Sequence, residues 1–387
     1  MYGLYHAIVG KSSPKIDKLY EPVLEWRELI MKAFFSSIFD RLERIVMNHS
    51  PGGKRITLQD LARETGYTVN TVSRALKNKS DISRATCEQI QRVAQEMGYV
   101  RNYMASSLRS GRTRTLGVIV GGMSNPFYSI MADDIQDVAM SLGYSLMILC
   151  SRDEPALEMH VVETAMSRQV DGILLFPCKG SQPTIDRLKT AGIPFVLMSR
   201  YLARGAEDSV ICDEEEGAYL ATRHLIQAGR RKLAYLYTYD VIYSSEMRMH
   251  GFRRACAEAG IPPEDSHVYN CQNDRATLEQ LKRWKHEGVN GLFFFCDMEA
   301  WNAISCMHSA GLRVPDDFAV TSFDNIQGKM HFPTPLCSVD GCMPEIARSG
   351  IDLLRKRIHG EDLPVQTIVY PVRLVCRGSC EAEAGRG

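Results

Sequence analysis

The sequence has little of what marks a membrane protein or a secreted protein. None of its apolar runs reaches the roughly 18 residues of a membrane-spanning helix. The apolar segment 29–39 is interrupted by Lys32 and lacks the small-residue cleavage site of a secretory signal. The 12 cysteines form no CxxC pair, and the closest pairs are Cys337/Cys342 and Cys376/Cys380. We interpret them as reduced thiols and expect a cytoplasmic protein without disulfides or bound metal.

Motifs of the common enzyme classes are missing as well. The chain contains no GxGxxG, no Walker loop, no GxSxG and no HExxH, and its ten histidines do not cluster at metal-ligand spacing. We therefore predict a protein that is not an enzyme and that uses no cofactor.

Charge is unevenly distributed along a chain that is neutral as a whole. The 387 residues hold 46 Lys and Arg against 46 Asp and Glu. Between Lys54 and Arg114 there are twelve basic and five acidic residues, a surplus of 12 − 5 = +7, which leaves −7 for the remainder. A basic segment beside an acidic body is typical of a head that binds nucleic acid.

Three short helices are predicted within this basic segment. Thr57 followed by Asp60 forms a capping box at the start of the first helix, and Gly66 provides the left-handed residue that ends it. A second helix follows at 69–76 and a third at 83–97, which together supply a small three-helix core. The apolar positions at helical spacing are Leu58, Leu61 and Ala62, then Val69, Val72 and Leu76, then Ile90, Val93, Ala94 and Met97.

Two short helices joined by a tight turn are typical of a helix-turn-helix, whose second helix enters the major groove of DNA. Val69 and Asn70 are expected to face bases, since asparagine pairs bidentately with adenine and valine contacts a thymine methyl; Arg74 reaches a guanine. A helical hairpin without a DNA role is the structural alternative. The other predicted DNA-binding residues are Thr57, Thr68, Thr71, Ser73 and Lys77, of which Thr68, Thr71 and Ser73 suit phosphates.

Beyond Thr115 the pattern changes to continuous apolar runs that alternate with amphipathic stretches. The runs LGVIV, SLMIL, GILLF, FVLM, KLAYLY, GLFFF and FAVTSF predict strands buried on both faces. Alternation of strand and helix predicts parallel sheets with right-handed crossovers. It occurs in two blocks, 116–212 and 230–320, so we expect an α/β body of two doubly wound lobes. Ligands of such folds bind beyond the carboxyl ends of the strands.

The sequence resembles the LacI-GalR family of transcriptional repressors. The resemblance covers about residues 56–378 and rests on TLQDLARETGYTVNTVSRAL, IQRVAQEMGYVRNYMASSLRSGRTRTLGVIV and FDNIQGKMHFPTPLCSVD. It implies a hinge helix over 102–110, beginning at Asn102, that orders on operator DNA. Leu108 would be an apolar wedge in the minor groove beside the same leucine of a dimer partner, and Ala105 would allow close approach. An ordinary linker leucine is the alternative. Arg101 stands where the family usually has proline.

For the body, the resemblance implies a homodimer and a periplasmic-binding-protein-like domain that binds a small effector. Arginine and aspartate across a cleft can fork onto adjacent hydroxyls, and Phe127 can stack on a sugar ring. Phe127 as core and Asp324 with Asn325 as a turn cap are the structural alternatives. Arg248 near the start of a helix requires a carboxylate or a ligand as its partner. The implied effector-binding residues are Asn125, Phe127, Ser199, Arg200, Ser244, Arg248, Asp297 and Asp324.

The class of effector is left between two alternatives, with a sugar or sugar derivative as the first choice. Ile242 stands where purine-responsive relatives keep an arginine, which weakens a purine assignment. Cys296 replaces the commoner asparagine beside Asp297. A sugar would act as an inducer, and a purine as a corepressor. A periplasmic sugar-binding protein would share the two lobes, but it would need a signal peptide and would lack the basic head.

The predicted organisation is therefore a DNA-binding head followed by an effector-binding body. Since no capped helix or strand pattern connects the first 46 residues to the head, we expect them to be dispensable for DNA binding. The expected segments are an unassigned extension (1–54), the helix-turn-helix domain (55–100), the hinge helix and linker (101–114), and the two-lobed effector-binding and dimerisation domain (115–380).

Overall fold

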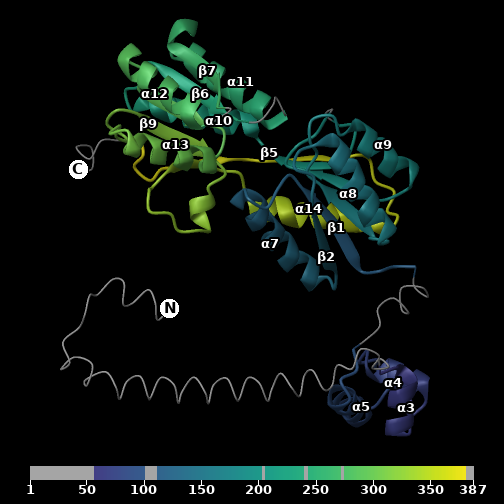
Figure 1. Ribbon diagram of the computed structural model, residues 1–387. Coiled ribbons are helices and arrows are strands. Elements are labelled where there is room, and N and C mark those ends of the chain that lie inside the picture. Colours follow the sequence, from purple (N-terminus) through teal and green to yellow (C-terminus); the bar gives the residue numbers. More distant parts are fainter. Residues whose placement is uncertain (1–55, 101–110, 203–204, 239–242, 272–273, 381–387) are drawn as a thin grey trace, which may run out of the picture. The chain divides into compact units, whose positions relative to one another are not determined.

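The computed structural model describes residues 56–100, 111–202, 205–238, 243–271 and 274–380. These residues fall into two compact units, a head of residues 56–100 and a body of residues 111–380 (Figure 1). The predicted hinge, with Asn102, Ala105 and Leu108, and the unassigned extension 1–54 lie outside the described residues. None of the described helices is both long enough and apolar enough to cross a membrane.

The head consists of three capped helices around a small apolar core. They are α3 (Leu58–Thr65), α4 (Val69–Ala75) and α5 (Arg84–Glu96). The predicted capping box is present, because Asp60 N–H donates to Thr57 Oγ1 at 3.3 Å while Thr57 N–H donates to Asp60 Oδ2 at 2.9 Å. Gly66, at φ 74°, ends α3 in the left-handed conformation. The core is built from Leu61, Val72 and Ile90, each fully buried.

The body contains two six-stranded sheets among its described residues, and each sheet is the centre of one lobe. The first sheet is formed by β1 (Thr115–Val120), β2 (Ser145–Cys150), β3 (Gly172–Leu175), β4 (Phe195–Met198), β5 (Ser209–Cys212) and β11 (Thr367–Tyr370). Its order is β11-β5-β4-β3-β1-β2, and every adjacent pair is parallel. The parallel arrangement predicted from the apolar runs is therefore confirmed.

The second sheet repeats this plan with one exception at its edge. It is formed by β6 (Leu233–Tyr237), β7 (Ser266–Asn270), β8 (Gly291–Phe294), β9 (Ala319–Phe323), β10 (Cys337–Asp340) and β12 (Arg373–Val375). The order is β12-β10-β9-β8-β6-β7, and β12 alone runs antiparallel to its neighbour in this sheet. The short strand β12 was not predicted, because its three residues carry no periodic signal.

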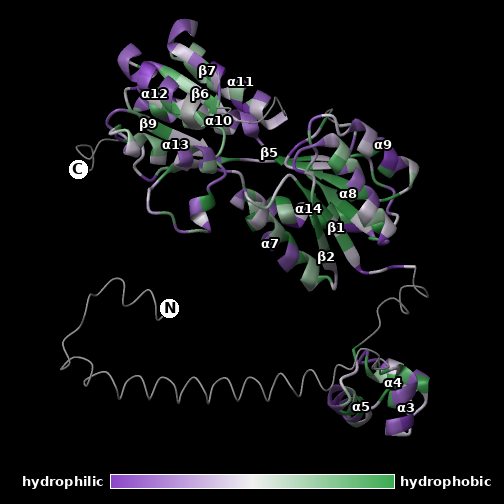
Figure 2. Ribbon diagram, viewed as in Figure 1, coloured by the Kyte–Doolittle hydropathy of each residue, from purple (hydrophilic) through white to green (hydrophobic). Residues whose placement is uncertain are grey.

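Helices cover both faces of each sheet, and the strands between them are the most apolar part of the body (Figure 2). In the first lobe, α7 and α14 pack on each other while α8 and α9 pack together; in the second lobe, α10 and α11 pair, and α12 packs on α13. The bounds are α7 (Pro126–Ser141), α8 (Pro155–Ser167), α9 (Gln182–Thr190), α10 (Glu214–Gln227), α11 (Tyr243–Glu258), η1 (Pro263–Asp265), α12 (Asp274–Glu287), α13 (Asp297–Ser309), η2 (Ile326–Gly328) and α14 (Met343–Ile358).

The chain passes between the lobes three times, after β5, between β10 and α14, and between β11 and β12. The two predicted blocks form most of the two lobes, but α14 and β11 return to the first lobe, where α14 packs on β3, β4 and α7. One expectation was wrong in detail. The run SLMIL forms β2 at the sheet edge, where its side chains are only partly buried and Ile148 is 39% exposed.

Candidate functional site

A cavity in the body collects polar and aromatic side chains from both lobes. It is open to solvent, and about 590 Å³ of empty space lies within it when the part that opens to solvent is counted. It lies beyond the carboxyl ends of strands, as expected for open α/β sheets. Of the predicted effector residues, the cavity is lined by Asn125, Phe127, Ser199, Arg200, Ser244, Arg248 and Asp324.

The first lobe contributes Arg200, which is held by a carboxylate and by a phenol hydroxyl. Arg200 donates to Asp153 Oδ1 at 2.9 Å and to the Tyr128 hydroxyl at 2.9 Å. Burial raises the pKa of Tyr128 to about 12, so the phenol remains protonated. Phe127 packs its ring edge-on against Tyr128, with centroids 5.3 Å apart. The side-chain oxygen of Asn125 caps α7 by accepting a hydrogen bond from Phe127 N–H at 3.0 Å. This bond holds Asn125 and Phe127 at the start of the helix.

Ser199 stands out because its hydroxyl is buried and has no hydrogen-bond partner among the described residues. It follows β4 directly and has a φ of 59°, a left-handed conformation that is uncommon for serine. A buried hydroxyl without a partner is costly, since it loses its bonds to water and gains none in return. Because Ser199 lines the cavity, a ligand polar atom is a suitable partner for it.

The second lobe contributes a buried ion cluster centred on Arg248 of α11. Its Nε donates to Glu214 Oε2 at 2.6 Å, and its Nη2 lies 3.7 Å from Asp324 Oδ1. A further guanidinium N–H donates to the carbonyl oxygen of Phe295. The guanidinium carbon lies 3.6 Å from the centre of the Phe323 ring, a cation–π contact. The carboxylate partner that the sequence required for Arg248 is therefore present.

Asp324 follows β9 and is held in an unusual backbone conformation, with φ at 105°. Its N–H donates to the carbonyl oxygen of Val339 at 3.0 Å. Burial raises its pKa well above the usual range for an aspartate, and the positive charge of Arg248 opposes this shift. A strained, buried acid beside an arginine is typical of a binding site rather than of a simple turn cap.

Asp297 was predicted as an effector residue, but the structure places it outside the cavity lining. Its carboxylate is fully buried in the second lobe, where it accepts from the hydroxyls of Ser322 and Ser338 and from Ile326 N–H at 2.8 Å. Burial raises its pKa to about 6. Asp297 therefore anchors the segment after β9. The neighbouring Cys296 is also buried and also absent from the lining.

Several lining residues were missed by sequence reasoning. Glu214 begins α10 directly after β5, and its place beyond a strand end is a signal that could have identified it. Three others are aromatic, two lie on α14, a helix whose return to the first lobe was not predicted, and Cys212 and Gly341 lie at the ends of β5 and β10. The missed lining residues are Tyr128, Cys212, Glu214, Phe295, Phe323, Gly341, Met343 and Ile346.

In the head, the exposed start of α4 is the candidate DNA-reading surface. Val69 is 41% exposed, so it does not join the core with Val72, and Asn70 beside it is exposed as well. Arg74 forms an ion pair with Asp81 at 2.6 Å. This exposed pair was not predicted, and Arg74 would have to leave it in order to contact a guanine. Thr68 Oγ1 accepts from Thr71 N–H at 3.1 Å and so caps the helix.

The remaining predicted DNA-binding residues lie on the same helices or near them. Thr57 Oγ1 donates to Asp60 Oδ2 at 2.7 Å, so its hydroxyl is part of the cap. Ser73 is half-buried and Lys77 is exposed. Residues 56–100 hold six basic and five acidic side chains, so their surplus is only 6 − 5 = +1. The other six basic residues of the predicted +7 flank this unit, at 54, 55, 101, 109, 112 and 114.

Comparisons with known proteins give matches for both the head and the body. Residues 57–102 match the model of bacterial regulatory proteins of the lacI family. Residues 113–284 match periplasmic binding proteins and the sugar-binding domain of the LacI family, and residues 222–380 match a periplasmic binding protein-like domain.

Individual relatives extend over most of the chain. Catabolite control protein A of Priestia megaterium is 28% identical over 329 residues, which cover 84% of this chain and 99% of that protein. The transcriptional repressor PurR of Aliivibrio salmonicida (strain LFI1238) is 27% identical over 307 residues, which cover 78% of this chain and 92% of PurR. A solved complex of the transcriptional regulator CelR with cellobiose has a TM-score of 0.62, with 26% identity, over 84% of this chain and 100% of CelR.

Proposed function

Because the chain belongs to the LacI family of bacterial transcriptional regulators, we propose that it is a repressor whose affinity for operator DNA is controlled by a ligand bound in the body cavity. A DNA-binding regulator of this family works in the cytoplasm, where the chromosome is. The proposal rests on one observation: the same chain contains a capped helix-turn-helix and a cavity lined by buried side chains of opposite charge.

DNA contact is assigned to the start of α4 in the head. Val69 and Asn70 present an apolar and an amide side chain to solvent at the helix start, the position that reaches base edges in a helix-turn-helix. Lys77 lies beyond the end of α4, where a cation contacts phosphate without reading sequence. The basic flanks on either side of the head add phosphate contacts, so affinity falls steeply with salt.

The ligand is assigned as a sugar or a sugar derivative. Arg200 and Arg248, with the carboxylates of Glu214 and Asp324, offer charged donors and acceptors to adjacent hydroxyls. Ser199 adds a hydroxyl to which no described residue is hydrogen-bonded, and the aromatic wall at Phe127 suits the apolar face of a sugar ring. The cellobiose complex of CelR supports this class of ligand.

A purine remains the second candidate, favoured by the similarity to PurR repressors. Flat bases require stacking between aromatic faces, and the cavity has aromatic side chains on both lobes, Phe127 and Tyr128 on one and Phe295 and Phe323 on the other. Ile242, the residue that argued against a purine, lies outside the described residues. The two candidates differ in the expected sign of the effect on DNA binding.

A homodimer is proposed as the functional form, since a pseudo-palindromic operator is read by two copies of the head. The exposed apolar side chains of the first lobe support this assignment. Met140 on α7 is 62% exposed and Ile148 on the edge strand β2 is 39% exposed, and these two elements pack against each other. Burying them against a second copy removes apolar surface from water.

Closing the lobes around a sugar would move the first lobes of the dimer relative to each other, so that the hinge segments no longer meet at Leu108. Ligand and DNA then weaken each other's binding by the same factor. A sugar is thus expected to induce, whereas a purine would strengthen DNA binding.

The test combines a ligand screen with operator binding. Sugars, nucleobases and amino acids are screened by thermal shift, and DNA selected from a random pool is then bound with and without the hit. Ser199→Ala should weaken ligand binding about tenfold without lowering stability, because the hydroxyl has no partner to lose among the residues that the structure describes. Ser167→Ala, at an exposed helix end, is the matched control. Stabilisation by nucleobases alone, or unchanged ligand affinity in Ser199→Ala, would contradict the sugar assignment.

A further inference from the structure

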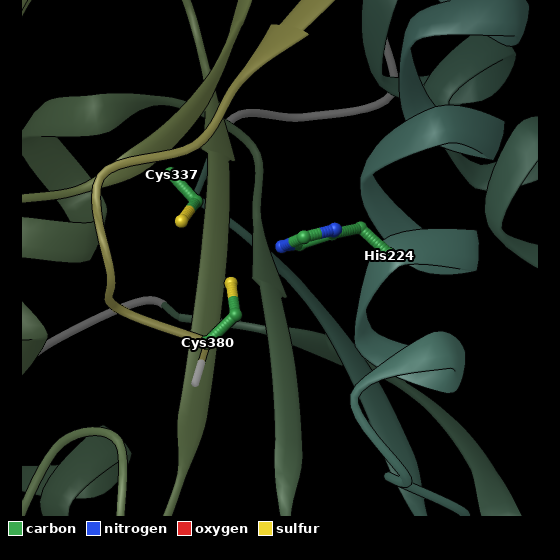
Figure 3. Close-up of side chains that lie close together, drawn as sticks. All are labelled: His224, Cys337 and Cys380. Carbon is green, nitrogen blue, oxygen red and sulfur yellow. The ribbon is translucent and has the colours of Figure 1, made fainter. Parts of the chain in front are cut away.

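Away from the ligand cavity, three cysteines and one histidine converge in the second lobe. The ligand atoms of His224, Cys337 and Cys380 all lie within 4.8 Å of one another (Figure 3). Cys376 belongs to the same group, since its Sγ lies 3.3 Å from Cys337 Sγ and 3.4 Å from His224 Nε2. Cys337 and Cys380 are fully buried and Cys376 is exposed.

The fold brings these residues together from three segments that are distant in sequence. His224 lies in the last turn of α10, which packs on β10 and β12. Cys337 begins β10, and the antiparallel register of β10 with β12, in which Ser338 pairs with Val375, sets Cys376 opposite Cys337. Four residues after Cys376, Cys380 is held in place by Ser379, whose hydroxyl accepts from Cys337 N–H at 2.8 Å.

We propose that His224, Cys337, Cys376 and Cys380 bind one Zn²⁺ ion. Three thiolates and one imidazole form a ligand set that structural zinc sites use, in tetrahedral geometry. Zinc–sulfur bonds of about 2.3 Å at the tetrahedral angle place two sulfur atoms about 3.8 Å apart. The 3.3 Å between the sulfur atoms of Cys337 and Cys376 is shorter than this value, and the ligand atoms of His224, Cys337 and Cys380 lie within 4.8 Å of one another. The side chains, Cys376 above all, would have to rotate to complete the tetrahedron.

The surroundings of Cys337 suit a metal-bound sulfur. The backbone N–H of Arg377 donates to Cys337 Sγ at 3.2 Å, the type of outer hydrogen bond that orients and stabilises metal ligands. The ligand set favours zinc over magnesium or calcium, because those harder ions require oxygen ligands. A disulfide between Cys337 and Cys376 is the competing chemistry, but it would leave His224 and Cys380 without a role.

The site would act as a structural clamp. All four positions are supplied by protein side chains, which leaves no open position for substrate. The ion would fasten the segment after β12 to α10, the helix whose other end carries Glu214 of the ligand cavity. The spacing of the four ligands is unlike that of any common zinc motif, and for this reason the cysteines were interpreted as simple reduced thiols.

Zinc content of the full-length, untagged protein tests the proposal. After purification under reducing conditions and dialysis into metal-free buffer, we expect inductively coupled plasma mass spectrometry to find one zinc ion per chain. Because Cys337 and Cys380 are buried, the informative variants are Cys376→Ser and His224→Gln, with circular dichroism as the check of folding. Each should bind zinc at least about tenfold more weakly in competition with a chromophoric chelator. Cys306→Ser, at a partly buried cysteine on α13, is the matched control and should keep full zinc affinity.

Cobalt substitution counts the thiolates independently of affinity. The cobalt protein should show a thiolate-to-metal charge-transfer band, which Cys376→Ser should reduce by about one third because one of three sulfur ligands is lost. A reduced wild-type protein that binds no zinc, or variants that bind it as tightly as wild type, would overturn the proposal. So would a mass lower by two hydrogen atoms, without zinc, in the protein isolated under air, since it would identify a disulfide formed by oxidation with oxygen instead.

Discussion

Replacing Glu214 by glutamine is expected to destabilise the body far more than the same change at Glu215, the next residue of α10. The two glutamates pair with two arginines of α11, but in different surroundings. Glu214 and its partner Arg248 have side chains that are only 2% and 6% exposed, whereas Glu215 and its partner Arg254 are 38% and 37% exposed. Burial is therefore the main difference between the two pairs.

The magnitude follows from what each substitution leaves behind. Removing one partner of a buried ion pair costs about 3–5 kcal/mol, because the remaining charge is desolvated without full compensation. Asp324 stays 3.7 Å from the Arg248 guanidinium, so we expect the lower end, about 3 kcal/mol. An exposed pair contributes about 0–1 kcal/mol, and Arg254 keeps Glu216 at 2.5 Å. Glu215→Gln should therefore cost less than about 1 kcal/mol.

Calorimetric or fluorescence-monitored melting of the body measures both variants. For a domain of this size, about 1 kcal/mol corresponds to roughly 2–4 °C in Tm, which gives a fall of about 6–12 °C for Glu214→Gln and at most about 4 °C for Glu215→Gln. Glu214→Gln should also weaken ligand binding, since Glu214 lines the cavity. Equal melting temperatures for the two variants would refute the argument from burial.

Three further outcomes are expected. Asn70→Ala should cost about 1–3 kcal/mol at one base position of the operator, while Lys77→Ala should weaken operator and random DNA alike; equal losses on both DNAs for Asn70→Ala would contradict the base contact. Leu61→Ala should destabilise the head by about 2–5 kcal/mol, because this side chain is fully buried, and abolish DNA binding while ligand binding by the body persists in titration calorimetry. Burial raises the pKa of Glu299 from 4.5 to about 7, so the stability it contributes is present below pH 4.5 and is lost, by about 3 kcal/mol, as pH rises to about 7. Glu299→Gln should flatten this part of the pH–stability curve, and an unchanged slope in chemical denaturation would exclude Glu299 as its cause.

Local signals in the sequence predicted the elements well where one short segment contains all the information. The capping box of Thr57 and Asp60 and the left-handed Gly66 define α3, because helix ends are determined by hydrogen bonds within a few residues. Runs such as LGVIV predicted central strands, since a strand buried on both faces must be apolar at every position. The same logic overstated the burial of β2, because an apolar run does not say which strand lies at the edge.

The lining of the body cavity was predicted in part, and the residues that were missed have a common cause. Seven of the eight predicted effector residues line the cavity, but Asp297 points into the core of the second lobe, where two serines and a backbone N–H satisfy it. The sequence does not reveal which of the two carboxylates at neighbouring strand ends, Asp297 or Asp324, faces the cavity. Glu214 was missed because its importance depends on Arg248, which is 34 residues away in sequence.

The sequence by itself determined the helix-turn-helix, the alternation of strands and helices, and the family to which the chain belongs, since all three rest on local periodicity and on motifs of contiguous residues. Tertiary structure alone decided the return of α14 and β11 to the first lobe and the meeting of His224 with Cys337, Cys376 and Cys380. These features depend on which distant segments the sheets bring into register, and no pattern within one segment encodes that choice.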